Sequence, residues 1–491
     1  MSLRLRDHDR FALAILVAIV ATRVIGSLTL PIYDDAFITF RYAVNLAEGR
    51  GFVYQPNEWV LGTTAPLFGL IGAAMHALGL SLPVAVPLLN LGCELAVAAL
   101  TISVVAKEHG RLAAVLFGAA FALSPMLVRI SVGGMEANLF LLATLLSLHL
   151  YARGWSRYAV AIAAASYFLR PEGVLTVGLL CIMTVGSGRW RQALALSVIA
   201  LAIVAPGLLA MHHYYGSIVP HSVIAKAGAP RAALVQVVRS LVLPNAVSAA
   251  LLLLGIPGVS RLARSTGLLR SMLFWVLAYL AAYCLARPQI WSWYSEPVQY
   301  VLCVLAGIGA SRVLVRWRAW AEARSELVAS AAAAGAVAMW LAVYVMQGRS
   351  GVTRNVYRAM NEFFRQYPTG EAVIFAEDIG AVGYYSHGRV YDAAGLVTPD
   401  ALRYTSVPAR IDAVRPRYLL VNATRAEITM LRDGGFLHDY TAVRRFSPSG
   451  ESTVVQDPQQ YSAEWVQSYV WYARSGDADR VATRGLMRRE P

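Results

Sequence analysis

The stretch "LPIYDDAFITFRY", residues 30–42, follows the first long apolar run of the chain and places two carboxylates, Asp34 and Asp35, where that run ends. Adjacent acids repel each other, and each resists removal from water. A pair of acids at the mouth of an apolar helix therefore needs compensating groups nearby. The rest of the sequence indicates what those groups are.

The composition around this stretch is typical of a membrane protein. The 491 residues are 57% hydrophobic and only 15% charged, which is far too apolar for a soluble protein. Apolar runs recur from Phe11 to about Met346, and a mixed, polar segment begins near Gly348. We therefore predict a polytopic helical membrane domain over residues 1–348 and a soluble α/β domain over residues 349–491.

The formal charge of +14 does not indicate a nucleic-acid-binding protein, because much of the excess lies in short loops between apolar runs, where Lys and Arg set topology. All four cysteines lie in apolar segments, so no disulfide framework and no CxxC metal motif is expected. The first apolar run is too long for a signal-peptide core and no small-residue cleavage site follows it, which predicts a retained helix.

A membrane-spanning helix needs roughly 20 apolar residues. The apolar runs predict eleven such helices, at residues 11–30, 83–105, 112–130, 136–152, 158–170, 173–186, 192–211, 237–257, 268–286, 297–315 and 326–346. The runs at 158–170 and 173–186 are short and flank "LRPEG".

The segment "APLFGLIGAAMHALG", residues 65–79, is long enough to cross only if it is stretched. If it does not cross, all the basic loops, from the first at Arg4 to the last at Arg324, fall on the cytoplasmic side. We therefore predict that this segment lies along the outer interface. The outer side then collects the two acids, the loops rich in Gly, Pro and aromatic residues, and the C-terminal segment.

Residues 34–48 have the pattern of an amphipathic helix that is ended by Gly49 and Gly51. Its apolar face carries Phe37, Phe40, Val44 and Ala47, and its polar face carries Asp34, Arg41, Asn45 and Glu48. The helix would lie flat on the outer leaflet. One alternative makes Asp34 an ordinary N-cap and Asp35 a neighbour favoured by the helix dipole; the other makes the pair functional.

The stretch "DDAFITFRYAVNLAEGRGFVYQPNEWVLGTTAPLF" resembles the first extracytoplasmic loop of GT-C glycosyltransferases, and is most similar to the terminal arabinofuranosyltransferase type. Further similar motifs follow in order: "GGMEANLFL", "LRPEG", "GSIVPHSVIAKA", "WYSEP" and "AEDIGAVGYYSHGRVYDAAGLVTPD". The ordered set is more specific for the fold than for the sugar. The resemblance implies an integral membrane transferase with a polyprenyl-phosphate sugar donor, an acid in the first outer loop, interfacial helices and a soluble domain.

Sugar transfer from a lipid phosphate needs a base for the acceptor hydroxyl and cations for the departing phosphate, which is already a good leaving group. Asp34 or Asp35 fits the base, and the other acid would orient it or hold a sugar hydroxyl. Because the two acids interact, their apparent pKa values describe the pair and not either residue alone. Direct displacement would invert the anomeric centre, as the resemblance implies.

The candidate cations for the donor phosphate are Lys226, His221, Arg170 and Arg231. Lys and Arg are usually enriched in cytoplasmic loops, so basic residues on the outer side indicate a specific role. Lys226 and Arg231 would alternatively meet lipid headgroups. Arg170 would alternatively form a structural pair with Glu172, because an ion near membrane depth needs a partner.

Four further residues are candidates for substrate binding: Arg41, Glu136, Trp293 and Tyr294. Glu136 would alternatively be a first-turn acid on a helix dipole, and the aromatic pair would alternatively be ordinary interfacial residues. No paired-histidine or clustered-carboxylate spacing indicates a metal, so no cofactor is predicted and a divalent ion stays open.

The pattern of the C-terminal segment predicts a strand, a turn at Asp378, a short helix and a second strand. It predicts further strands near 415–422, 440–446 and 452–457. Its "GAVG" does not have the spacing of a dinucleotide-binding fingerprint.

The preferred interpretation is a multi-pass glycosyltransferase of the plasma membrane that decorates a cell-envelope glycan or glycolipid, with arabinofuranose as one candidate sugar. Its partners would be the lipid-linked donor, the acceptor and membrane lipids, and not nucleic acid. The rival is a non-enzymatic lipid-linked-sugar transporter or a glycan-binding membrane protein. A transporter would place its ionisable residues near the bilayer midplane, often within internal repeats, whereas here they lie in predicted outer loops and no repeat is found.

Overall fold

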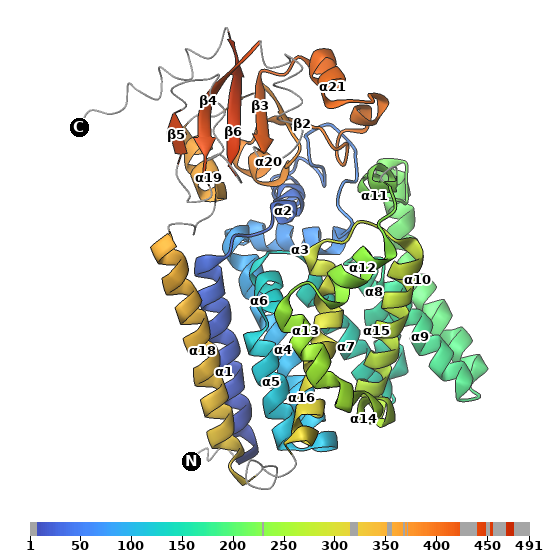
Figure 1. The fold of residues 1–491 in the computed structure, drawn as a ribbon. Helices are drawn as coiled ribbons and strands as arrows, with labels where there is room; N and C mark the ends of the chain where they lie inside the picture. Colours follow the sequence, from blue (N-terminus) through green and yellow to red (C-terminus); the bar gives the residue numbers. More distant parts are fainter. Residues whose placement is uncertain are drawn as a thin grey trace.

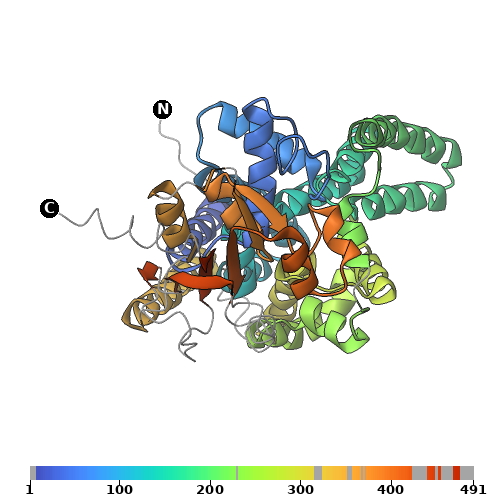
Figure 2. The same ribbon diagram turned by 90° about the horizontal axis from the view of Figure 1, so that it is seen from above.

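The computed structural model describes residues 7–227, 230–314, 323–350, 356–366, 369–370, 372–422, 439–447, 452–454 and 468–475. A bundle of helices forms one end of the molecule and a sheet with a few short helices forms the other (Figure 1). Viewed from above, the sheet lies over the helix bundle (Figure 2).

Six helical segments among the described residues are long and apolar enough to cross a membrane. They are α1 (Asp7–Thr29), α4 (Leu82–His109), α10 (Trp190–Tyr215), the continuous pair α13 (Ala246–Gly255) and α14 (Val259–Arg264), α15 (Gly267–Ala286) and α18 (Ser325–Ser350). A seventh results if α5 (Arg111–Leu123) and α6 (Pro125–Val132), which are bent by 59°, are counted as one span. The chain is therefore a multi-pass membrane protein.

This number is smaller than the eleven spans predicted from the apolar runs. Three apolar helices are short: α3 (Pro66–Ala77), α7 (Ala137–Ala152) and α9 (Gly173–Gly186). The predicted span at 158–170 is represented by α8 (Ser156–Ser166), and the one at 297–315 by α16 (Glu296–Val313). The bend between α5 and α6 follows from Pro125, which has no N–H to continue the helical ladder.

A buried ion pair and small residues hold the bundle together. Arg23 of α1 donates through Nε and Nη2 to the two carboxylate oxygens of Glu94 in α4, at 2.9 and 3.0 Å. A Cβ at Gly307 of α16 would lie 2.6 Å from the Phe117 nitrogen in α5, so only glycine permits this approach. Close backbone contact at small residues is a common way to pack helices within a membrane.

Two helices, α2 (Asp34–Ala47) and α3, lie across the end of the bundle, between it and the sheet (Figure 1). They correspond to the predicted amphipathic helix and the predicted interfacial helix. The apolar face of α2 is buried at Phe37, Phe40 and Val44, but Arg41 and Asn45 on its polar face are buried as well. The C-terminal part of the chain covers that polar face.

The C-terminal part, here called the sheet domain, is built on six strands in the order β2-β1-β3-β6-β4-β5. β1 (Val373–Ala376), β2 (Arg389–Asp392) and β3 (Tyr418–Asn422) are parallel, and α20 (Gly380–Ser386) connects the first two. β6 (Tyr469–Arg474), β4 (Tyr440–Phe446) and β5 (Ser452–Val454) are antiparallel to their neighbours. The flanking helices are α19 (Val356–Gln366) and α21 (Val407–Val414).

The strands expected from the sequence are observed as β1 to β5, although residues 455–457 of the last predicted strand lie outside the described residues, and β6 is an addition. The remaining short helices lie in loops at the sheet end of the bundle: α11 (His221–Ala227), α12 (Leu234–Val242) and the 3₁₀ turn η2 (Ser292–Ser295); another 3₁₀ turn, η3 (Pro399–Arg403), belongs to the sheet domain.

Candidate functional site

Two glycines hold the start of α2 against the helix bundle. The Tyr33 N–H donates to the Gly133 carbonyl at 2.9 Å, and a Cβ at Gly133 would clash with the Tyr33 ring. Gly134 has φ of +79°, and a Cβ there would lie 3.2 Å from the Ala36 side chain. The glycines of "GGMEAN" therefore allow the loop that carries Glu136 to pack beside the first turn of α2.

Arg170, in the loop between α8 and α9, is the centre of the polar contacts on this side of α2. Its side chain is 4% exposed, and its Nη2 donates to Glu172 Oε1 at 2.8 Å. Its Nη1 lies 3.7 Å from Glu136 Oε1, and its guanidinium lies 4.5 Å from the centre of the Tyr294 ring. The predicted pair with Glu172 is thus present, and Glu136 and Tyr294 join it.

Asp35 acts electrostatically on the same group of residues. Burial raises the pKa of Tyr294, the charge of Arg170 lowers it, and the charges of Glu172, Glu136 and Asp35 raise it. We refer to Asp35, Glu136, Arg170, Glu172, Trp293 and Tyr294 as the Arg170 cluster.

An aromatic row borders this cluster. The Tyr33 and Trp293 rings lie 4.9 Å apart, and the Tyr33 hydroxyl and the Ser292 hydroxyl are hydrogen-bonded at 2.6 Å. Trp293 is stacked between Trp291 and Tyr294, with ring centres 5.8 and 5.9 Å away. Trp291 is exposed, so the row runs from the cluster to the surface.

Asp34 makes its contacts on a different side of α2. Its Oδ2 accepts the Gly380 N–H at 2.7 Å and its Oδ1 accepts the Ala381 N–H at 2.8 Å, so it caps the first turn of α20 in the sheet domain. The N-cap of α2 is Tyr33, and no side chain caps that helix. The alternative in which Asp34 is the N-cap of its own helix is therefore wrong; it caps another one.

The environment of Asp34 shifts its titration into the neutral range. Burial and the nearby charge of Asp378 raise the pKa of Asp34 to about 8, Asp35 raises it as well, and the two backbone N–H donors lower it. Asp378 accepts a hydrogen bond from the Tyr469 hydroxyl at 2.6 Å. The two helix donors therefore offset only part of the effect of burial among other acids.

Arg41 lies at the other end of α20. Its Nη1 donates to the Gly383 carbonyl at 2.6 Å and its Nη2 to the Gly388 carbonyl at 2.8 Å, while its Nε donates to the Tyr54 carbonyl at 2.7 Å. An acid at the N-terminus and a guanidinium at the C-terminus both match the dipole of α20. We call this arrangement of Asp34 and Arg41 the α2–α20 clamp.

Glycines of "GAVG" make the clamp sterically feasible. A Cβ at Gly380 would clash with the Asp34 carbonyl oxygen, and a Cβ at Gly383 would clash with the Tyr54 hydroxyl. These two glycines are one turn apart on the same face of α20, so the motif lets α20 approach both α2 and the loop that carries Tyr54 closely.

The structure separates the predicted site residues into groups. Glu136, Arg170, Trp293 and Tyr294 come together in the Arg170 cluster, and Asp35 acts on it through its charge. Arg41, which we expected to bind substrate, instead uses its guanidinium to hold the sheet domain.

The remaining predicted cations lie in and just after α11. Lys226 is exposed on α11. Arg231 is also exposed and lines a cavity of about 370 Å³ together with Trp291, the surface end of the aromatic row. The backbone N–H of His221 donates to the Leu61 carbonyl at 2.7 Å, and burial lowers the pKa of its imidazole.

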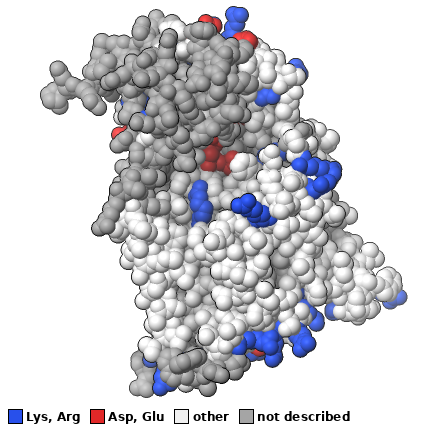
Figure 3. Space-filling model, in the orientation of Figure 1, with Lys and Arg blue, Asp and Glu red and all other residues white. Residues whose placement is uncertain are grey.

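Arg129 was not among the residues predicted from the sequence. It lies in α6, donates to the Pro31 carbonyl, and places its guanidinium 3.8 Å from the centre of the Tyr33 ring, directly before the two acids. The signal was a lone arginine near the end of the predicted span at 112–130, where an ion needs a partner. Figure 3 shows acidic side chains in a recess between the two ends of the molecule, with basic side chains beside it on the bundle side.

A metal site is not formed by the residues that the structure describes, since no three His, Cys, Asp or Glu side chains among them are grouped to hold an ion.

The sequence matches one family model, described as a domain of unknown function (DUF8728), over residues 324–472. None of the curated proteins matches the chain.

Solved structures match nearly the whole chain. ArnT from Cupriavidus metallidurans bound to undecaprenyl phosphate is similar with a TM-score of 0.63 at 15% identity, over 95% of this chain and 98% of that one. The oligosaccharyltransferase AglB from Archaeoglobus fulgidus, in complex with an inhibitory peptide and a dolichol-phosphate, is similar with a TM-score of 0.54 at 12% identity, over 97% of this chain and 78% of that one. At these identities the likeness concerns the fold, and the fold of this chain is the GT-C fold.

Proposed function

We propose that this protein is a membrane glycosyltransferase that moves a sugar from a polyprenyl-phosphate donor to a glycan or glycolipid of the cell envelope. The observation that carries the proposal is the Arg170 cluster, where several acids, one guanidinium and aromatic rings meet at the end of an apolar helix bundle. The proposal is supported by two structures of this fold that hold undecaprenyl phosphate and dolichol-phosphate.

Asp35 is the general base in this proposal, and Asp34 is a positioning residue. Both oxygens of Asp34 accept hydrogen bonds from backbone N–H groups, so its carboxyl group is occupied in binding the N-terminus of α20. Asp35 belongs to the Arg170 cluster, beside the aromatic row that reaches the surface. As the new bond forms, the acceptor hydroxyl transfers its proton to Asp35 while the lipid phosphate leaves, and the anomeric centre is inverted.

The cations divide into two kinds. Arg170 is neutralised by Glu136 and Glu172, so its role is to fix the geometry of the cluster. Arg129 and Arg231 have no carboxylate within ion-pair distance among the described residues, and they flank the aromatic row. We assign the donor phosphate to these two, with Lys226 and His221 nearer the bilayer surface.

The sheet domain lies outside the cell in this proposal, and the membrane is the plasma membrane. Basic side chains gather at the end of the bundle farthest from the sheet (Figure 3), which supports a cytoplasmic location for that end. The division between the membrane domain and the outer domain is proposed at residues 348 and 349, and arabinofuranose is proposed as the sugar on the resemblance of the first loop alone.

The proposal is tested with the full-length protein in lipid nanodiscs and a panel of polyprenyl-phosphate sugars, including the arabinofuranosyl donor, with a cell-envelope glycan fraction as acceptor. We expect transfer from one donor, with release of polyprenyl phosphate. Absence of transfer from every donor, together with movement of a lipid-linked sugar across proteoliposome membranes, would favour the transporter instead.

A further inference from the structure

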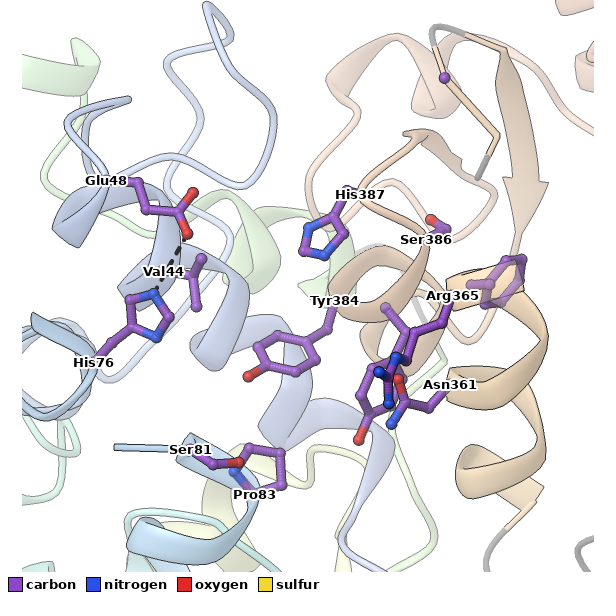
Figure 4. A pocket seen from close by; sticks show the side chains of 13 residues that line it. Val44, Glu48, His76, Ser81, Pro83, Asn361, Arg365, Tyr384, Ser386 and His387 are labelled. Carbon is purple, nitrogen blue, oxygen red and sulfur yellow. Dashed lines mark hydrogen bonds and ion pairs between the residues drawn. The ribbon is translucent and has the colours of Figure 1, made fainter. Parts of the chain in front are cut away.

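A second cavity, of about 740 Å³, lies on the other side of the interfacial helices. Its walls come from the ends of α2 and α3, the start of α4, and from α19 and α20 of the sheet domain. In Figure 4, Glu48 and His76 lie on one side of the cavity, and Tyr384 and His387 lie on the opposite side. None of these residues belongs to the Arg170 cluster or to the α2–α20 clamp.

The cavity is well separated from the proposed transfer site. Asp35 is in the first turn of α2 and Glu48 is the residue that ends it, thirteen positions later. A rise of 1.5 Å per residue puts about 20 Å between the two positions. A ligand in this cavity therefore does not occupy the place where the glycosidic bond forms.

The side chains around the cavity offer hydrogen-bond donors and acceptors next to each other. The Glu48 carboxylate is held by Arg50 and lies 3.4 Å from His76 Nε2, so it remains directed to this region. Asn361 and Arg365 extend from α19 on the other wall (Figure 4). A hydroxyl both donates and accepts, so a polyhydroxylated ligand can satisfy an acid, an amide and a guanidinium at once.

Aromatic rings complete the lining. Tyr384 and Tyr385 line the cavity with ring centres 5.0 Å apart, and the Tyr384 ring projects towards its centre (Figure 4). Such rings provide flat apolar surface with a polar tip. A lipid tail would remove ionised groups from water without compensation.

We propose that this cavity binds a neutral oligosaccharide and is a second glycan site, about 20 Å from the site of transfer. That this oligosaccharide is a segment of the acceptor rests on the proposed function. A polymeric acceptor held here would keep one part bound while its growing end reaches Asp35, so the protein would favour long acceptors over short ones.

The test uses the full-length protein in nanodiscs and neutral hexasaccharides of arabinofuranose, mannose and galactose, with binding measured by saturation-transfer NMR. We expect at least one hexasaccharide to bind, and we expect Tyr384→Ala and Asn361→Leu each to weaken its binding by about tenfold, the loss of one good contact. Tyr158→Ala, at an exposed tyrosine of α8, is the matched control and leaves binding unchanged. Asn361→Leu keeps the test valid if Tyr384→Ala does not fold.

Two results would overturn this inference: no hexasaccharide binds, or binding is unchanged in both variants. Asp35→Asn separates this inference from the proposed function, because it should abolish transfer and leave hexasaccharide binding intact. If the wild-type protein transfers no sugar yet binds a hexasaccharide in the cavity, the proposed function fails and the binding site stands. If it transfers sugar without such binding, only the second site fails.

Discussion

Asp34 and Asp35 are consecutive residues of one helical turn, yet the two regions that they face are built differently. The α2–α20 clamp surrounds Asp34 with backbone N–H groups of the sheet domain. Asp35 acts through its charge on the Arg170 cluster, which is made of charged and aromatic side chains of the helix bundle. Successive residues of an α-helix point about 100° apart, so one short helix can join two domains and also supply a reactive acid.

This difference implies that substitutions on the two sides have different effects. Changes in the cluster should reduce transfer through its chemistry and its buried charges. Changes in the clamp should weaken the contact between α2 and the sheet domain. Any loss of transfer should follow from that weakened contact.

The largest effect is expected for Arg170→Met, which leaves Glu136 and Glu172 buried without their cation. Breaking a buried ion pair on one side costs about 3–5 kcal/mol. We expect the free energy of unfolding in detergent to fall by about that amount, and transfer to be lost. The double variant Arg170→Met/Glu172→Gln should recover part of the stability, and equal stability of wild type and Arg170→Met would contradict a structural role for the pair.

A smaller effect is expected in the clamp for Gly380→Ala. The added Cβ would clash with the Asp34 carbonyl oxygen, so α20 must move away from α2. Overpacking of this kind costs about 1–3 kcal/mol. Limited proteolysis should cut the sheet domain free faster than in the wild type, whereas Gly178→Ala, at a position with nothing within 4 Å, should not change the rate. Identical proteolysis of both variants would mean that the close approach is not needed.

A third prediction concerns pH. The folded-state pKa of Asp34 is about 8 and that of Asp392 is about 6, both above the value of 3.8 for an ordinary aspartate, mainly because of burial. A raised folded-state pKa gives stability that is complete below the unfolded pKa and lost as pH rises through the folded pKa. The melting temperature of the sheet domain should therefore fall between about pH 4 and pH 8.

In Asp34→Asn only Asp392 still contributes to the pH dependence of the melting temperature. The decline of the melting temperature should then be confined to about pH 4 to 6. A decline that still continues to pH 8 in this variant would show that another group titrates there.

The smallest effect is expected for Lys226→Gln. Lys226 is exposed, and a single cation near an anionic surface contributes about 1 kcal/mol, which salt screens. We expect the apparent donor KM to rise about fivefold at low salt and kcat to stay unchanged. A loss of kcat of a hundredfold would instead place Lys226 at the reacting phosphate.

The sequence was informative about the fold where patterns are local. The amphipathic helix from Asp34 and several strands follow from periodicity and turn residues, and a helix is observed within the apolar segment 65–79. The number of spans did not follow, because length in the sequence does not distinguish a full span from a short helix packed beside it, as α8 and α9 show.

The candidate site was only partly predictable from the sequence. Motif residues pointed to Asp35, Glu136 and Arg170, but no local pattern could indicate that Arg41 would be bonded to carbonyls of residues more than 300 positions away. Arg129 was not predicted for the same reason. It lies inside an apolar run, and its contact with the ring of Tyr33 joins residues that are distant in sequence. Contacts across the two domains depend on the folded arrangement and leave little trace in either segment alone.

The central claim is the assignment of the base to Asp35 and not to Asp34. The most direct measurement compares single-turnover transfer by Asp35→Asn and Asp34→Asn, each at saturating donor and in parallel with donor binding. The account predicts a loss of about 10²–10⁴-fold for Asp35→Asn with donor affinity retained, and a much smaller loss for Asp34→Asn once the sheet domain is shown to be folded. Full activity of Asp35→Asn, or the reverse order of the two losses, would contradict it.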